Sequence, residues 1–170
     1  MIRPLFDGYD IVYTPNDIAE MVIHGARSTA KILINYDTKQ GFSIIDANHF
    51  EKIASIKKNV DIYSKHVIYS IWNGNDCIYV GVTDSENNTV YNRISRYIKE
   101  LRDNSASTEG HASARNMRYI MGNNDIDISQ LDLYVTIYND YNKIKDIHPQ
   151  VNYSEVERRI AKMLNARFFK

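Results

Sequence analysis

Two tyrosines stand ten residues apart in the stretch VIYSIWNGNDCIYVGV, residues 67–82, one on each side of an Asn-Gly turn. The residues around that turn are mostly β-branched or aromatic, which predicts a β-hairpin with Tyr69 and Tyr79 close together across its strands. A phenol titrates near ~10, so it could accept a proton at neutral pH only beside a cation. A cross-strand aromatic pair that only stabilises the sheet is the alternative interpretation.

Length and composition limit the class of protein. A chain of 170 residues suits one domain, or a domain with an extension. Its single cysteine, Cys77, excludes a disulfide framework and a thiolate zinc site. The opening residues MIRPLFDGYD do not resemble a signal peptide, and no apolar run has the length of a membrane span. We therefore expect a cytoplasmic protein with no membrane partner.

Basic residues gather in two stretches of a chain whose formal net charge is zero. Residues 93–118 contain six basic and three acidic side chains, and residues 158–170 contain five basic and no acidic ones. Zero net charge argues against a protein that coats nucleic acid non-specifically, whereas two basic stripes are compatible with a groove that faces phosphates. Solvated helix faces would give the same pattern, so charge alone does not decide between the two.

The first 65 residues are predicted to fold as a helix–hairpin unit. A helix begins near Pro15 and ends near Gly25, and residues 31–47 are typical of a second hairpin that turns at 39–41. Residues 48–59 carry apolar side chains at helical spacing. This unit could be a DNA-binding accessory, a dimerisation element or additional packing.

The residues after the hairpin alternate between helices and a strand. In 90–104 a buried stripe of Val90, Ile94, Ile98 and Leu101 predicts a helix that carries Arg93 and Tyr97 at one flank of the stripe. A second helix, with a basic side, is expected from residue 111, and residues 130–139 alternate as a strand does.

A last helix in 152–169 separates two glutamates by its periodicity. Its core side is predicted to be Val156, Ile160, Met163 and Leu164. Glu155 falls on the polar side, where Arg158 and Arg159 at i+3 and i+4 account for it as a surface ion pair. Glu157 falls at the border of the buried stripe, a less ordinary place for a carboxylate.

Taken in order, these residues resemble the GIY-YIG nuclease superfamily over residues 66–166. VIY stands at the place of G-I-Y, YVG at that of Y-I-G, VYNRISRY at that of the arginine with a His or Tyr four residues later, and VERRIAKMLN at that of the metal-binding glutamate. Within the superfamily the chain is most similar to compact DNA endonucleases, phage endonuclease II and small restriction enzymes among them.

The resemblance implies an α+β fold: a small, mostly antiparallel sheet flanked by helices, with residues 66–170 as the nuclease core and 1–65 as an N-terminal extension for specificity or dimerisation. It implies a metal-dependent endonuclease that hydrolyses phosphodiester bonds in double-stranded DNA, in restriction, homing or phage degradation of host DNA. A homodimer on DNA, or sequential nicking of the two strands, is expected, because one phosphate cradle addresses one strand.

The resemblance also implies a role for each site residue. Tyr69 would deprotonate the attacking water, and Tyr79 would orient it. Arg93 would hold the scissile phosphate with Tyr97 beside it, and Glu157 would bind one Mg²⁺ or Mn²⁺ ion per active site. Further contacts to DNA are expected from Arg96, His111, Arg115, Arg118 and Asn165.

Three departures from the family pattern keep a different class of function open. Val67 replaces the first glycine, residues 84–88 form an insertion near the expected cleft, and Val82 stands where many relatives have a lysine. That lysine would be a cation able to lower the pKa of a tyrosine. The alternatives are a DNA-binding module whose nuclease site has decayed, and a protein-interaction domain that keeps only the scaffold.

Overall fold

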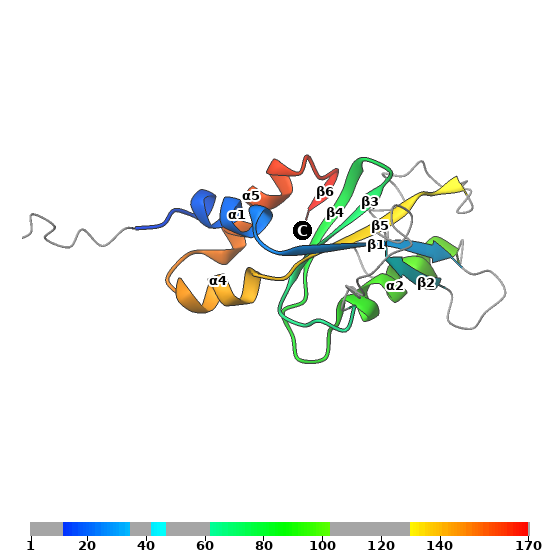
Figure 1. The fold of residues 1–170 in the computed structure, drawn as a ribbon, viewed down its shortest axis with the longest axis horizontal. Helices are drawn as coiled ribbons and strands as arrows, with labels where there is room; N and C mark the ends of the chain where they lie inside the picture. The colour runs from blue at the N-terminus through cyan, green and yellow to red at the C-terminus, as the bar shows by residue number, and fades with distance from the viewer. Residues whose placement is uncertain (1–11, 35–41, 47–61, 103–129, 170) are drawn as a thin grey trace, which may run out of the picture.

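The structure, a computed structural model, describes residues 12–34, 42–46, 62–102 and 130–169, which form one sheet with helices on both faces (Figure 1). The helices of this part of the chain are α1 (Pro15–His24), α2 (Val90–Arg102), α4 (Tyr141–Ile147) and α5 (Tyr153–Met163). The strands are β1 (Arg27–Ile34), β2 (Phe42–Asp46), β3 (Ile68–Asn73), β4 (Asp76–Val82), β5 (Leu133–Tyr138) and β6 (Phe168–Phe169). The predicted α+β class is confirmed.

The sheet is mostly antiparallel, with its six strands in the order β2-β1-β5-β3-β4-β6. Only β4 and β6 run parallel to each other. Both predicted hairpins are present, as β1–β2 and as β3–β4. Strand β5 lies between them and pairs with β1 on one side and β3 on the other, so it joins two hairpins that are far apart in the sequence.

Two hydrophobic cores lie on opposite faces of the sheet, because successive side chains of a strand point to opposite sides. On β3, Tyr69 and Ile71 join a core with residues of α2, whereas Ile68 joins a second core with residues of α1, α4 and α5. The stripe predicted for α2 is buried at Val90, Ile94 and Ile98. The side chain of Leu101 lies outside the described part.

Helix α1 begins where the sequence predicts. The Thr14 side chain accepts a hydrogen bond from the backbone of Asp17, whose carboxylate accepts one in return from the Thr14 backbone, and Pro15 occupies the first turn. Ile18, Ala19 and Val22 then face the core. This reciprocal cap satisfies backbone N–H groups at the start of the helix, which have no carbonyl acceptor in a preceding turn.

The predicted domain boundary between residues 65 and 66 separates strands that belong to one sheet. Strand β1 lies between β2 and β5, and α1 packs against α5 (Figure 1). The Ala26 amide donates to the Asp140 carboxylate at 2.7 Å, which ties β1 to the start of α4. In the ranges that the structure covers, the N-terminal part therefore belongs to the same sheet and core as the rest. Its use in specificity or dimerisation stays a prediction.

Several other predictions have an outcome in the fold. Val156 and Ile160 are buried on α5, but Met163 is 37% exposed, so its placement in the core was wrong. Helix α4 was not predicted, because seven residues are too few for a clear apolar period. The turn at 39–41 and the helices expected at 48–59 and from 111 lie outside the described residues. None of the helices described is long and apolar enough to cross a membrane.

Candidate active site

The β3–β4 hairpin sets the relative positions of the two tyrosines. Gly74 takes the left-handed conformation that the tight turn needs, with φ 57°. In the register that follows, Tyr69 lies opposite Gly81 and Tyr79 lies opposite Ile71. The tyrosines are therefore diagonal neighbours on one face of the sheet, with ring centroids 6.0 Å apart. Their predicted proximity across the strands is confirmed.

Gly81 is a glycine because the Tyr69 ring lies across it. A Cβ built at position 81 would stand 2.7 Å from Tyr69 Oη, 2.8 Å from Tyr69 Cζ and 2.6 Å from Tyr79 Cε1. Real Cβ atoms essentially never show heavy-atom contacts under 3.0 Å. The glycine of YVG is thus a steric requirement of the tyrosine of VIY, and the two tripeptides form one structural unit.

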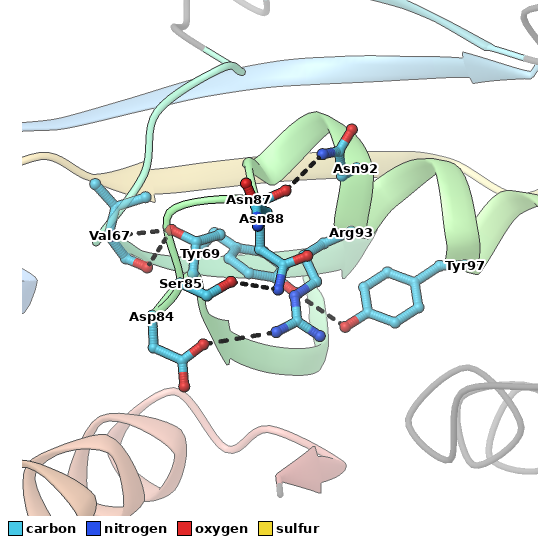
Figure 2. Close-up of polar contacts among 10 residues, drawn as sticks. Val67, Tyr69, Asp84, Ser85, Asn87, Asn88, Asn92, Arg93 and Tyr97 are labelled. Atoms are coloured by element: carbon cyan, nitrogen blue, oxygen red, sulfur yellow. Dashed lines mark hydrogen bonds and ion pairs between the residues drawn. The ribbon is translucent and has the colours of Figure 1, made fainter.

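Tyr97 on α2 completes a cluster of three phenols. Its hydroxyl lies 2.9 Å from that of Tyr69, and either oxygen can donate (Figure 2). The rings of Tyr79 and Tyr97 meet edge to face at 5.2 Å. Tyr97 was predicted at the flank of the helix, outside the core, and this is wrong: it is buried, because the hairpin tyrosines cover that flank.

Arg93 stands one helical turn before Tyr97 and beside the loop that was expected as an insertion. Its side chain is only 14% exposed, and its Nη2 lies 3.8 Å from Oδ1 of Asp84, which is 72% exposed (Figure 2). Two side-chain hydrogen bonds hold the loop in shape: Asn88 Nδ2 donates to Ser85 Oγ at 2.7 Å, and Nδ2 of Asn92 on α2 donates to the Asn87 backbone carbonyl at 3.1 Å. The loop therefore places a carboxylate next to the arginine.

Burial dominates the electrostatics of the phenols. It raises the pKa of Tyr69 well above the ordinary value of 10.0, Tyr97 and Tyr79 raise it further, and Arg93 acts in the opposite direction. Burial likewise raises the pKa of Tyr97, ahead of the effect of Tyr79. A lowered pKa was expected for a tyrosine that acts as a base. The cation is in place, but desolvation outweighs it, so both residues are neutral phenols at neutral pH.

Glu157 lies on α5, half-buried as its helical position predicted. Its Oε1 accepts a hydrogen bond from the Tyr141 hydroxyl at 3.2 Å. Burial raises the pKa of Glu157, the bond from Tyr141 and the charge of Lys145 lower it, and the charge of Asp84 raises it. Glu155 instead forms the predicted surface ion pairs, at 3.5 Å to Arg158 and 3.0 Å to Arg159.

Asp84 connects the two halves of the site. It forms an ion pair with Arg93 on the α2 side, and its charge acts on Glu157 and on Tyr141 on the α5 side. Sequence reasoning missed both Asp84 and Tyr141. Asp84 belongs to a loop whose direction no periodicity reveals, and Tyr141 opens the short helix α4.

The donor set at Glu157 is compatible with a hard divalent cation. Mg²⁺ in proteins is bound through one or two carboxylates and keeps most of its waters. Glu157 Oε2 makes no hydrogen bond within the described ranges, and a cation would offset the repulsion between Glu157 and Asp84. In those same ranges no three or more His, Cys, Asp or Glu side chains are grouped so that they could hold a metal ion.

The remaining predicted contacts to DNA are only partly described. Arg96 is exposed on α2, and Asn165 is exposed just after α5 with φ 50°. His111, Arg115 and Arg118 lie outside the described residues. The structure thus brings Tyr69, Tyr79, Arg93 and Tyr97 together on the α2 side of the hairpin, while Glu157 lies on the α5 side and is linked to them through Asp84.

Comparison with known proteins adds no relative: no protein-family model, no curated protein and no solved structure matches this chain. What the chain does is therefore inferred from the chemistry of this site.

Proposed function

We propose that this chain is a metal-dependent DNA endonuclease of the GIY-YIG type that cleaves double-stranded DNA site-selectively. The observation that carries this proposal is the close approach of Tyr69 to Gly81, at 2.7 Å from the position of an added Cβ. It explains physically why the two tripeptides occur together, and it supports reading them as one site rather than as two unrelated strands. Sheet stabilisation alone needs no glycine opposite a tyrosine.

Arg93 is the proposed phosphate ligand. A phosphodiester carries a negative charge that increases at its non-bridging oxygens during hydrolysis, and a guanidinium can donate two hydrogen bonds to it. Arg93 is held at the surface of the tyrosine cluster with part of its side chain exposed. In this arrangement the substrate phosphate takes the place of Asp84 beside the guanidinium.

The tyrosines are proposed to position the attacking water. As a neutral phenol, Tyr69 can both donate and accept a hydrogen bond, and its bond to Tyr97 orients its hydroxyl. The phenolate of Tyr69 is proposed to accept the proton of the water, and because the raised pKa keeps its fraction small at neutral pH, the rate is expected to rise with pH. Tyr79 packs against both rings and orients them.

Glu157, with Asp84 nearby, is proposed to hold one Mg²⁺ or Mn²⁺ ion. The bound ion would supply positive charge at the phosphate and the leaving oxygen. Tyr141 keeps the Glu157 carboxylate oriented through its hydrogen bond to Oε1. Because one such site addresses one strand, we propose that the protein acts as a homodimer on DNA or nicks the two strands in sequence.

A second candidate is a DNA-binding module that has lost catalysis. The burial of Tyr69 and Tyr97, which hydrogen-bond to each other, favours it, as does Val82 in place of a lysine. Both candidates use Arg93 and the basic residues to bind phosphates. They differ in the need for a metal and in whether the DNA is cut.

Plasmid cleavage in Mg²⁺, Mn²⁺ and EDTA tests the proposal, with Glu157→Ala and the matched surface variant Glu155→Ala. We expect nicked or linear plasmid only with a metal, loss of cleavage in Glu157→Ala with DNA binding retained, and unchanged cleavage in Glu155→Ala. Mg²⁺ at ten times its Kd should also stabilise the wild type against unfolding by about 1.4 kcal/mol, but not Glu157→Ala. Cutting in EDTA or equal loss from both variants would contradict the assignment, and binding without cutting would support the second candidate.

A further inference from the structure

A cavity of about 350 Å³ opens on the face of the sheet away from the tyrosine cluster. Trp72 lines it, and because side chains alternate along β3, Trp72 points to the opposite face from Tyr69 and Ile71. Thr29 of β1, Tyr134 and Thr136 of β5, Asp132, and the turn at Gly74 and Asn75 complete the lining. None of these groups is used by the proposed endonuclease site.

Two aromatic side chains stand next to each other in this cavity. Trp72 and Tyr134 are directly paired across β3 and β5. The indole N–H of Trp72 donates to Ser70 Oγ at 2.7 Å, so the polar edge of the indole is satisfied within the sheet. The ring is thereby held in place, and its remaining surface is apolar.

Hydrogen-bonding groups surround the aromatic pair and are themselves well positioned. The hydroxyls of Thr29 and Thr136 lie 2.8 Å apart. The backbone of Asp132 is fixed at both ends, since its N–H donates to Asn73 Oδ1 at 2.9 Å and its carbonyl accepts from the Gly74 amide at 2.8 Å. A ligand would therefore meet a preformed rim of hydroxyl, amide and carboxylate groups around the aromatic pair, and such polar groups fix a ligand's orientation in a small-molecule site.

The charge of the cavity indicates an uncharged ligand. Asp132 is the one charged residue in the described part of the lining, and the Lys31 ammonium lies 2.7 Å from its carboxylate. That ammonium also lies over the Tyr134 ring, 5.6 Å from its centroid. Among the described residues no lysine or arginine lines the cavity, so this part of the lining offers no cation to a phosphate or sulfate.

We propose that this cavity binds an uncharged nucleobase, stacked on Trp72 beside Tyr134, with its polar edge toward Thr29, Thr136 and Asn75. Every base has an apolar π-face that stacks on aromatic rings and a polar edge that hydrogen-bonds with side chains. The base could belong to a free nucleoside or to an unpaired position in a strand, and the chemistry of recognition is the same. The proposal is independent of the endonuclease function.

The experiment uses Trp72 as its own reporter, because it is the only tryptophan of the chain. Adenosine, thymidine and single-stranded tetranucleotides are titrated in EDTA, which keeps a metal-dependent nuclease inactive. The readout is the fluorescence of Trp72, excited at the long-wavelength edge of indole absorption. Glucose and inorganic phosphate are the chemical controls. We expect saturable quenching by nucleosides or by tetranucleotides, and none by glucose or phosphate; quenching by tetranucleotides alone assigns the base to a strand.

Tyr134→Ala should weaken this binding about tenfold, the scale of one lost stacking partner. Tyr63→Ala is the matched control, because Tyr63 is an exposed tyrosine that stacks on Tyr91 and does not line the cavity. Circular dichroism of both variants checks that they are folded. Quenching by glucose, absence of quenching by every base-containing ligand, or equal affinity in Tyr134→Ala and the wild type would overturn the proposal.

Discussion

Gly81→Ala is the substitution that most directly tests how the tyrosine cluster is built. The added methyl would lie 2.6 Å from Tyr79 Cε1 and 2.7 Å from Tyr69 Oη, whereas ordinary contacts begin at 3.4 Å. Both rings are buried, so neither can swing into solvent, and ordinary contact would require a shift of roughly 0.7 Å for Tyr69 and roughly 0.8 Å for Tyr79 against packed neighbours. Overpacking of this kind costs about 1–3 kcal/mol.

For a chain of this size, each kcal/mol lowers the Tm by roughly 2–4 °C, so we expect a fall of about 2 to 12 °C in thermal unfolding followed by circular dichroism. Cleavage at a temperature where the variant is folded should fall further, because a displacement near 1 Å of reacting groups costs up to about 10² in rate. Stability and activity are thus both affected.

Gly25→Ala is the matched control. A Cβ at position 25 would lie 2.8 Å from Asp140 Oδ2 and 3.0 Å from the Met21 carbonyl, so the same substitution creates a similar clash away from the tyrosines. It should lower the Tm but leave the cleavage rate of the folded protein unchanged. In a Tyr69→Ala background, Gly81→Ala should cost at least ~1 kcal/mol less than in the wild type. A wild-type Tm for Gly81→Ala, or equal loss of cleavage in both glycine variants, would refute the steric explanation.

Three further predictions concern the charges and protons of the site. Tyr69→Phe should lose at least ~10² in cleavage rate with its fold and DNA affinity intact, and Tyr79→Phe should lose less. Because the pKa of Tyr69 is raised, the phenolate fraction and the wild-type rate should climb about tenfold per pH unit from pH 7 to 9, and a plateau in that interval would exclude the phenolate as the working form. Asp84→Asn should tighten DNA binding about 2- to 10-fold, because it releases Arg93 to bind phosphate. The control Glu86→Gln removes the same charge from an 82% exposed position in the same loop and should have a smaller effect. An equal effect of the two variants in a filter-binding titration would show that only net charge matters.

Much of the local structure could be predicted because it depends on neighbours in the sequence. The Asn-Gly turn with β-branched flanks specifies the β3–β4 hairpin, and the reciprocal Thr14–Asp17 cap specifies the start of α1. The helical period separates Glu155, which forms surface ion pairs, from Glu157, which is half-buried. In each case the interacting groups lie within about one turn of helix or one hairpin of each other.

The tertiary structure alone decided which groups from distant elements of the sequence meet. Strand β5 lies between β1 and the β3–β4 hairpin and joins them into one sheet, and α4 brings Tyr141 to Glu157. The same packing buries Tyr97 against Tyr69 and so raises the pKa of both phenols above the value that the sequence would assign. Sequence patterns encode the period of a single element, whereas burial and pKa depend on atoms brought together from distant elements, and no local period records those contacts.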